Sequence, residues 1–273
     1  MERKKKILTI GDVHGRDKWM FHTHGSPYEF NFWKQAVENG APGDDDFWRD
    51  YPYMGFDKII FVGDYVDSYD LKNETILNNL KNIVFFKKMV PDKVVLLLGN
   101  HDIQYFIKDQ ICSGYRGEMY YDLNQIFNDK DLDFKIAHLE KDVEENNYLW
   151  THAGVTRGWL KETKIDILYP GYRFYDMVKE LEKQDIDVFL NGLFEIRCDN
   201  LFHVDEYSGG IHPWAGPLWV RPKVFNNDRL ERINQIVGHT PQNAIKIENI
   251  KEVKHYFVDC LWDDNDEALI LEL

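Results

Sequence analysis

The chain has 273 residues, of which 33 are Lys or Arg and 47 are Asp or Glu, so its formal net charge is −14 with neutral histidines. This acidic balance argues against nonspecific nucleic-acid binding, which needs a cationic surface, and the 44% hydrophobic content is too high for a disordered chain. Three widely spaced cysteines and no apolar run long enough for a membrane span predict a cytoplasmic protein without membrane contact.

Five short apolar runs predict buried β-strands, and each run ends in small and polar residues. They lie at 6–10, 58–62, 94–98, 148–150 and 235–237. In that order they are followed by Gly11-Asp12-Val13-His14-Gly15, Gly63-Asp64-Tyr65-Val66-Asp67, Gly99-Asn100-His101-Asp102, Thr151-His152-Ala153-Gly154 and Gly238-His239-Thr240-Pro241.

Two longer segments between these runs have the periodicity of amphipathic helices. Apolar residues recur at close to a 3.6-residue period over 71–89, and Pro91 ends that pattern. The segment 172–193 is a second candidate helix. Alternation of strands and helices predicts an α/β fold. Near the end of the chain, 255–262 and 267–273 predict a hairpin around a solvated acidic turn.

Two stretches predict insertions, one at about 16–56 and the other at about 200–222. Both mix aromatic residues with glycine and proline, and we expect them to form loops near the mouth of a site, where specificity is usually determined. No linker separates the strands into groups, so the sequence predicts a single domain over 1–273.

The polar residues after the five strands form one candidate metal site, because sites in open α/β sheets lie at the carboxyl ends of the strands. A donor set of nitrogen and oxygen atoms without thiolate suits Mn²⁺, Fe²⁺ or Zn²⁺. Six ligands are too many for one catalytic ion but suffice for two ions that share a bridging carboxylate. The six candidates are Asp12, His14, Asp64, Asn100, His152 and His239.

The ordered set of five motifs resembles the calcineurin-like metallophosphoesterases. Within them it is most similar to the phosphoprotein-phosphatase branch, which includes bacterial and phage Ser/Thr phosphatases and symmetrical diadenosine tetraphosphatases. The resemblance implies a sandwich of two mixed β-sheets flanked by helices, with loop or helical insertions. It also implies two divalent metal ions, with manganese as the first choice and iron or zinc as alternatives.

The same resemblance implies a role for each residue of the site. Asp12 and His14 would hold the first metal, Asp64 would bridge, and Asn100, His152 and His239 would hold the second. A metal-bound hydroxide would attack phosphorus. His101 would donate a proton to the leaving oxygen, and Asp67 would orient its imidazole, which agrees with the need of an alkoxide leaving group for a general acid.

The chain departs from the family pattern at Ser68, where phosphoprotein phosphatases carry an arginine that grips the substrate phosphate. Serine cannot replace a bidentate guanidinium contact. Two other arginines are candidates for phosphate binding. Arg221 resembles the second phosphate-binding arginine of the family, and Arg116 is the weaker candidate.

Three functions remain open from the sequence, and the oligomeric state is not determined. The first is hydrolysis of phosphomonoesters, with phosphoserine and phosphothreonine in proteins as possible substrates. The second is hydrolysis of dinucleoside polyphosphates, which Asp102 after the Gly99-Asn100-His101 motif weakly favours. The third is a non-catalytic scaffold of the same fold, which the presence of every ligand and of His101 disfavours.

Overall fold

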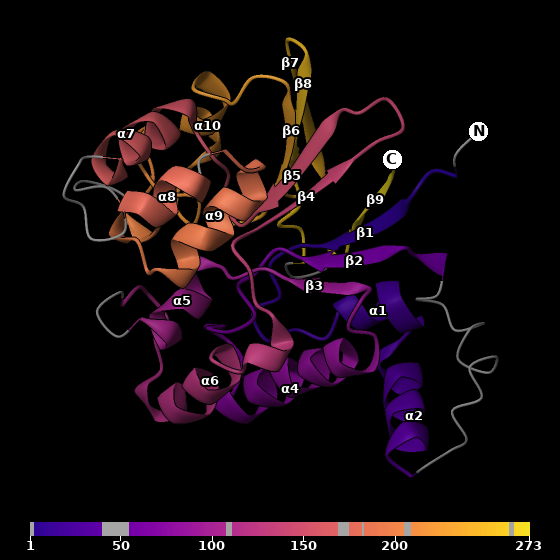
Figure 1. Cartoon of the computed structure of the whole chain (residues 1–273). Helices are drawn as coiled ribbons and strands as arrows, with labels where there is room; N and C mark the ends of the chain where they lie inside the picture. The colour runs from indigo at the N-terminus through magenta and orange to yellow at the C-terminus, as the bar shows by residue number, and fades with distance from the viewer. Residues whose placement is uncertain are drawn as a thin grey trace.

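The computed structural model describes residues 3–39, 55–107, 111–168, 175–181, 183–204, 209–261 and 265–273, and it contains two β-sheets (Figure 1). The first sheet has the strand order β3-β2-β1-β9. Strands β1 (Lys6–Ile10), β2 (Lys58–Phe61) and β3 (Val94–Leu96) run parallel, and β9 (Leu269–Glu272) pairs antiparallel with β1.

The second sheet has the order β4-β5-β6-β8-β7. Strands β5 (Asn147–Thr151), β6 (Ile233–Val237) and β8 (Val253–Phe257) are parallel, whereas β4 (Ala137–Lys141) and β7 (Lys246–Ile250) pair antiparallel at the two edges. Both sheets are therefore mixed.

Apolar side chains from both sheets form one continuous cluster. Ile7, Ile60 and Trp150 belong to it and are fully buried, as β-branched and aromatic residues of a sheet interior should be. The Trp150 indole also donates a hydrogen bond to the Thr9 hydroxyl at 2.9 Å, which joins β5 of one sheet to β1 of the other. Burial of this cluster fixes the two sheets, and hence the ends of their strands, relative to each other.

Helices flank the sheets (Figure 1). In the first half of the chain they are α1 (Trp19–His24), α2 (Pro27–Glu38), α4 (Asn73–Met89), α5 (Asn100–Phe106) and α6 (Tyr120–Phe127). In the second half they are α7 (Arg157–Ile167), α8 (Tyr175–Leu181), α9 (Ile186–Glu195) and α10 (Pro222–Asn227). None of the helices in the described ranges combines the length and the apolar composition that crossing a bilayer requires.

The structure confirms the predicted α/β fold with two mixed sheets flanked by helices. It places β-strands at all five predicted runs, with ends that differ by one or two residues. It also confirms the helix predicted over 71–89, which is α4.

The two predictions for the C-terminal third are wrong in detail. The segment 172–193 contains two helices, α8 and α9, and α9 begins after Asp185. Strands β8 and β9 do not form a hairpin, because β8 pairs with β6 and β7 whereas β9 pairs with β1 in the other sheet. Residues 258–261 between them are buried. Residues 263 and 264 of the predicted acidic turn lie outside the described residues.

The expectation of a loop over 16–56 is also corrected, although residues 40–54 lie outside the described part. Helices α1 and α2 occupy 19–38. Trp19 of α1 packs edge-to-face on Phe61 of β2 and stacks with Phe86 of α4, and Phe30 and Trp33 of α2 are buried. These large aromatic rings make the segment part of the core.

Candidate metal centre

The six predicted metal ligands come from segments that directly follow strands of both sheets. Asp12 and His14 follow β1, Asp64 follows β2, Asn100 begins α5 after β3, His152 follows β5, and His239 follows β6. The structure brings these segments together. Two sets of side chains, Asp12-His14-Asp64 and Asp64-His152-His239, each have ligand atoms within 4.8 Å of one another. Asp64 belongs to both sets.

The backbone at this site is unusual. His14, Asp64, Asp67 and His239 have φ values of 45°, 51°, 65° and 64°, in the left-handed region that residues other than glycine seldom adopt. Such conformations cost free energy and persist only where surrounding contacts enforce them. Three of these residues, His14, Asp64 and His239, belong to the ligand groups, so part of the stability of the fold is given up at the site.

Each of the three imidazoles at the centre has one ring nitrogen beside a backbone carbonyl. His14 Nδ1 lies 2.9 Å from the Val66 oxygen and His152 Nδ1 lies 2.9 Å from the Val62 oxygen. His239 Nε2 lies 3.0 Å from the Trp219 oxygen. Because a carbonyl can only accept, each of these nitrogens carries the proton, and the other nitrogen presents a lone pair.

These lone pairs face oxygen atoms that are also acceptors. His152 Nε2 and His239 Nδ1 lie 2.9 and 2.8 Å from Asn100 Oδ1. His152 Nε2 and His14 Nε2 lie 3.4 and 3.8 Å from Asp64 Oδ2. Lone pairs that converge in this way repel one another unless a cation lies among them. The donor chemistry and the hydrogen bonds that orient each imidazole therefore fit a divalent metal centre.

The protonation tendencies agree with this arrangement. Burial lowers the pKa of His14, and burial together with the neighbouring His152 and Arg221 lowers the pKa of His239 well below its ordinary value. Burial alone would raise the pKa of Asp64, but His152 and His101 outweigh it and hold that pKa far below the ordinary value. Neutral imidazoles at His14 and His239 beside an ionised Asp64 carboxylate are the forms that bind metal ions.

His101 and Asp67 lie at the edge of this centre. The Nδ1 atom of His101 is 3.3 Å from Asp67 Oδ2, and its backbone N–H donates to Asp64 Oδ1 at 2.9 Å. The Tyr105 hydroxyl holds the other oxygen of Asp67 at 2.6 Å. Burial lowers the pKa of His101, but Asp64 and the hydrogen bond with Asp67 outweigh it and raise that pKa to about 12. Asp67 and Asp64 therefore both favour the protonated form of this imidazole.

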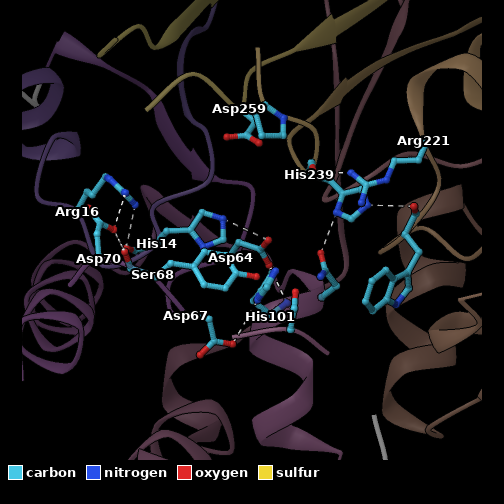
Figure 2. Close-up of a pocket in the computed structure, with 15 residues that line it drawn as sticks. His14, Arg16, Asp64, Asp67, Ser68, Asp70, His101, Arg221, His239 and Asp259 are labelled. Carbon is cyan, nitrogen blue, oxygen red and sulfur yellow. Dashed lines mark hydrogen bonds and ion pairs between the residues drawn. The ribbon is translucent and has the colours of Figure 1, made fainter. Parts of the chain in front are cut away.

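A cavity of about 440 Å³ opens over the centre (Figure 2). Asp64, Asn100 and His101 line it, whereas Asp12 and His152 do not and are buried. Arg221 also lines it, at the side opposite Arg16 in Figure 2. The Arg221 guanidinium donates to the His239 carbonyl and the Thr240 hydroxyl, both at 3.2 Å, so it is fixed next to the candidate ligands. Trp219 and Arg221 of the predicted 200–222 insertion thus lie at the mouth of the cavity.

The structure does not bring Arg116 into this cavity. Its guanidinium donates hydrogen bonds to the carbonyls of Ser68 and Leu71 and to the Asn73 side chain. Arg116 therefore supports the loop that contains Ser68 and does not line the space above the metal ligands.

Three acidic or basic residues of the site were not predicted. Asp102 accepts hydrogen bonds from the backbone N–H groups of Gly99, Asp64 and Tyr65 at 2.9, 2.7 and 2.9 Å, which ties two motifs together. Arg16 lines the cavity and directly follows the first motif, so its position in the chain could have indicated it. Asp259 lines the cavity after β8 and was hidden by the erroneous hairpin.

Comparisons with known proteins agree with this geometry. The family model of calcineurin-like phosphoesterases matches residues 5–257 of the chain. No curated protein sequence matches it. A structure described as a cold-active protein tyrosine phosphatase is similar over 98% of this chain and 74% of its own, with a TM-score of 0.52 and 18% identity, which supports the shared fold.

Two other solved structures are more distant. A protein serine/threonine phosphatase from Saccharomyces cerevisiae, described as similar to human phosphatase PP5, matches with 15% identity and a TM-score of 0.41, over 98% of this chain and 79% of its own. A putative diadenosine tetraphosphatase matches with 14% identity and a TM-score of 0.34, over 94% of this chain and 85% of its own.

Proposed function

Since this chain belongs to the calcineurin-like phosphoesterase family, we propose that it is a metal-dependent phosphatase that hydrolyses phosphomonoesters, including phosphoserine and phosphothreonine in proteins, at a dinuclear centre. One observation carries the proposal: two groups of ligand atoms share the carboxylate of Asp64, and the imidazole of His101, paired with Asp67, lies at their edge. Manganese is the metal we expect first, and iron or zinc would suit the same ligands.

In the proposed reaction the oxygen of water forms a bond to phosphorus and the bond between phosphorus and the ester oxygen breaks. Two divalent ions at the ligands would neutralise the phosphoryl oxygens and acidify the attacking water. His101 gives its proton to the leaving oxygen, which departs as an alcohol. Asp67 orients that imidazole and favours its protonated form through the 3.3 Å contact between Asp67 Oδ2 and His101 Nδ1. Arg221 contacts a phosphoryl oxygen from the side of the cavity.

A direct test is turnover of p-nitrophenyl phosphate by the metal-free protein reconstituted with Mn²⁺, Fe²⁺ or Zn²⁺. We expect hydrolysis that requires added metal and is highest with manganese. No turnover with any of the three metals would refute the phosphatase proposal and favour a scaffold. Equal amounts of enzyme are then given a phosphoserine peptide or diadenosine tetraphosphate, and the proposal requires that the peptide be hydrolysed faster.

Asp102, which weakly favoured the nucleotide alternative, does not line the cavity. It is fully buried and its carboxylate accepts three backbone hydrogen bonds. These hydrogen bonds give Asp102 a structural role, because they join the loops after β2 and β3.

The cytoplasmic location expected from the three cysteines also remains a proposal, which fractionation of the source cells would test.

A further inference from the structure

Arg16 occupies a second cationic position in the cavity, next to a candidate metal ligand. Its guanidinium donates to the backbone carbonyl of His14 at 3.4 Å and pairs with the Asp70 carboxylate at 3.0 Å. Only 16% of the Arg16 side chain is exposed, whereas 65% of the Asp70 side chain is. A largely buried cation is therefore paired with an exposed carboxylate, which also accepts a hydrogen bond from the Ser68 hydroxyl.

Arg16 also lines a second cavity, of about 420 Å³, on its other side. The two cavities therefore meet at Arg16. Lys18, Thr75 and three asparagines of α4 contribute to the second cavity, and Asp17 is the one carboxylate among its described lining residues. This surface offers both hydrogen-bond donors and acceptors, and its two cations against one carboxylate give it a net positive charge.

Asn79 is an unsatisfied donor of the second cavity. The residue is only 4% exposed, and its Oδ1 atom accepts a hydrogen bond from the Trp19 indole at 3.0 Å. That bond fixes the orientation of the amide, and its Nδ2 group finds no acceptor among the described residues. A buried N–H group without a partner is costly, but this Nδ2 group exposes almost no surface, so a ligand oxygen could bond to it only if the side chains around it moved.

The lining indicates which anionic ligand fits. Nucleobases are usually recognised by stacking on aromatic rings, and no aromatic ring lines the second cavity within the described ranges. Asparagine side chains instead pair well with peptide groups, and an arginine next to a lysine attracts a carboxylate. The lining of the second cavity therefore favours an acidic peptide over a nucleobase.

We propose that the substrate of this enzyme is a phosphopeptide segment with an acidic side chain beside the phosphorylated residue, and that Arg16 binds this carboxylate in place of Asp70 while the second cavity holds the adjoining peptide. This inference rests on the proposed phosphatase function. Arg16 is thus a specificity-determining residue, and Asp70 acts as an internal competitor that substrate displaces.

The experiment measures binding, so that it does not depend on turnover. Two peptides carry a non-hydrolysable phosphonate analogue of phosphoserine, flanked on both sides by glutamate in one and by glutamine in the other. Their dissociation constants are measured by fluorescence anisotropy with the manganese-loaded protein and with the variants Arg16→Ala and Asp70→Asn. Arg157→Ala is the matched control, since Arg157 also pairs with a carboxylate, Asp228, but lies outside both cavities.

We expect the glutamate peptide to bind the unchanged protein roughly five- to tenfold more tightly than the glutamine peptide. Arg16→Ala should abolish this preference, Asp70→Asn should increase it, and Arg157→Ala should leave it unchanged. Equal binding of the two peptides, a preference retained in Arg16→Ala, or binding of neither peptide would overturn the inference. Failure to hydrolyse p-nitrophenyl phosphate would instead refute the phosphatase proposal, and the binding data would still decide the role of Arg16.

Discussion

The imidazole of His101 lies against the carboxylate of Asp67, with 3.3 Å between Nδ1 and Oδ2, and that carboxylate is 1% exposed. A buried carboxylate that also accepts from Tyr105 and Gln104 cannot follow a moving partner, so it fixes the direction of the ring. The remaining nitrogen, Nε2, is the one left to donate a proton to a substrate.

Replacement of His101 by asparagine should therefore separate chemistry from metal binding. We expect His101→Asn to retain its metal ions and to lose ~10²–10⁴ in kcat for a phosphoserine peptide, because a serine alkoxide needs protonation. The loss should be much smaller for p-nitrophenyl phosphate, whose leaving group is stable as an anion. Steady-state kinetics on both substrates check this, with His203→Asn, an exposed histidine, as control. Equal losses on the two substrates would rule out His101 as the acid.

Removal of the guanidinium of Arg221 should weaken substrate binding without changing metal content. Arg221→Ala should lower kcat/KM by ~10–100-fold, the effect of losing one charge-assisted contact to phosphate. The neighbouring Lys223, an exposed cation of α10, provides the control variant Lys223→Ala. If Arg221→Ala retained the kcat/KM of the unchanged enzyme, phosphate contact by Arg221 would be excluded.

Two glycines should be essential because their neighbours are ligands. A methyl group at Gly238 would collide with Asp12 Oδ1, and one at Gly99 would collide with Asp64 Oδ1. We expect Gly238→Ala to weaken metal binding by ~10–100-fold, the range seen when the support of a ligand is disturbed. Isothermal titration calorimetry with Mn²⁺ measures it, and Gly55→Ala is the control, since no atom lies within 4 Å of its added methyl group. Unchanged affinity in Gly238→Ala would contradict the placement of Asp12.

The acid stability of the fold should depend on Glu140, which lies between His138 and Lys5 at 3.0 and 2.5 Å. Burial raises the pKa of Glu140, but these two partners outweigh it and lower the pKa from 4.5 to about 2. The ionised group therefore stabilises the folded state above pH 4.5, and this contribution disappears as the pH falls toward 2. It amounts to roughly 3 kcal/mol.

Urea unfolding of the metal-free protein tests this. Glu140→Gln should be less stable than the unchanged protein at pH 6, and the difference should shrink steadily as the pH is lowered from 5 to 2. Glu145→Gln serves as control, because Glu145 is 78% exposed and its pair with Lys141 should contribute little. A difference that stays constant with pH would show that the ionisation of Glu140 does not stabilise the fold.

Much of the site was predictable because its ligands follow short buried strands in the chain. A run of branched apolar residues that ends in Asp or His marks both the strand and the place where the side chains converge, as at Asp12 and Asp64. Which ring nitrogen of each imidazole faces the metal site was not predictable. It depends on hydrogen bonds to backbone carbonyls of other segments, such as those of Val62 and Val66.

The predictions that were wrong also concern contacts between segments that lie far apart in the chain. Strand β9 pairs with β1, more than 250 residues earlier in the chain, and local sequence carries no information on that pairing. Helix α2 begins at Ser26-Pro27, a typical helix start, but the aromatic residues that follow it resemble an irregular loop until they are seen packed on Phe86. The role of Arg16 depends on Asp70, which no spacing rule links to it.

The most direct test of the dinuclear centre is metal analysis of Asp64→Asn by plasma mass spectrometry, combined with turnover of p-nitrophenyl phosphate. Asp64 is the one residue shared by both ligand groups among the described residues, and an amide cannot balance the charge between two divalent ions. We predict about two metal ions per chain in the unchanged protein, a clearly lower content in Asp64→Asn, and no measurable turnover by that variant. Two bound ions and near-normal turnover in Asp64→Asn would contradict the dinuclear centre proposed here.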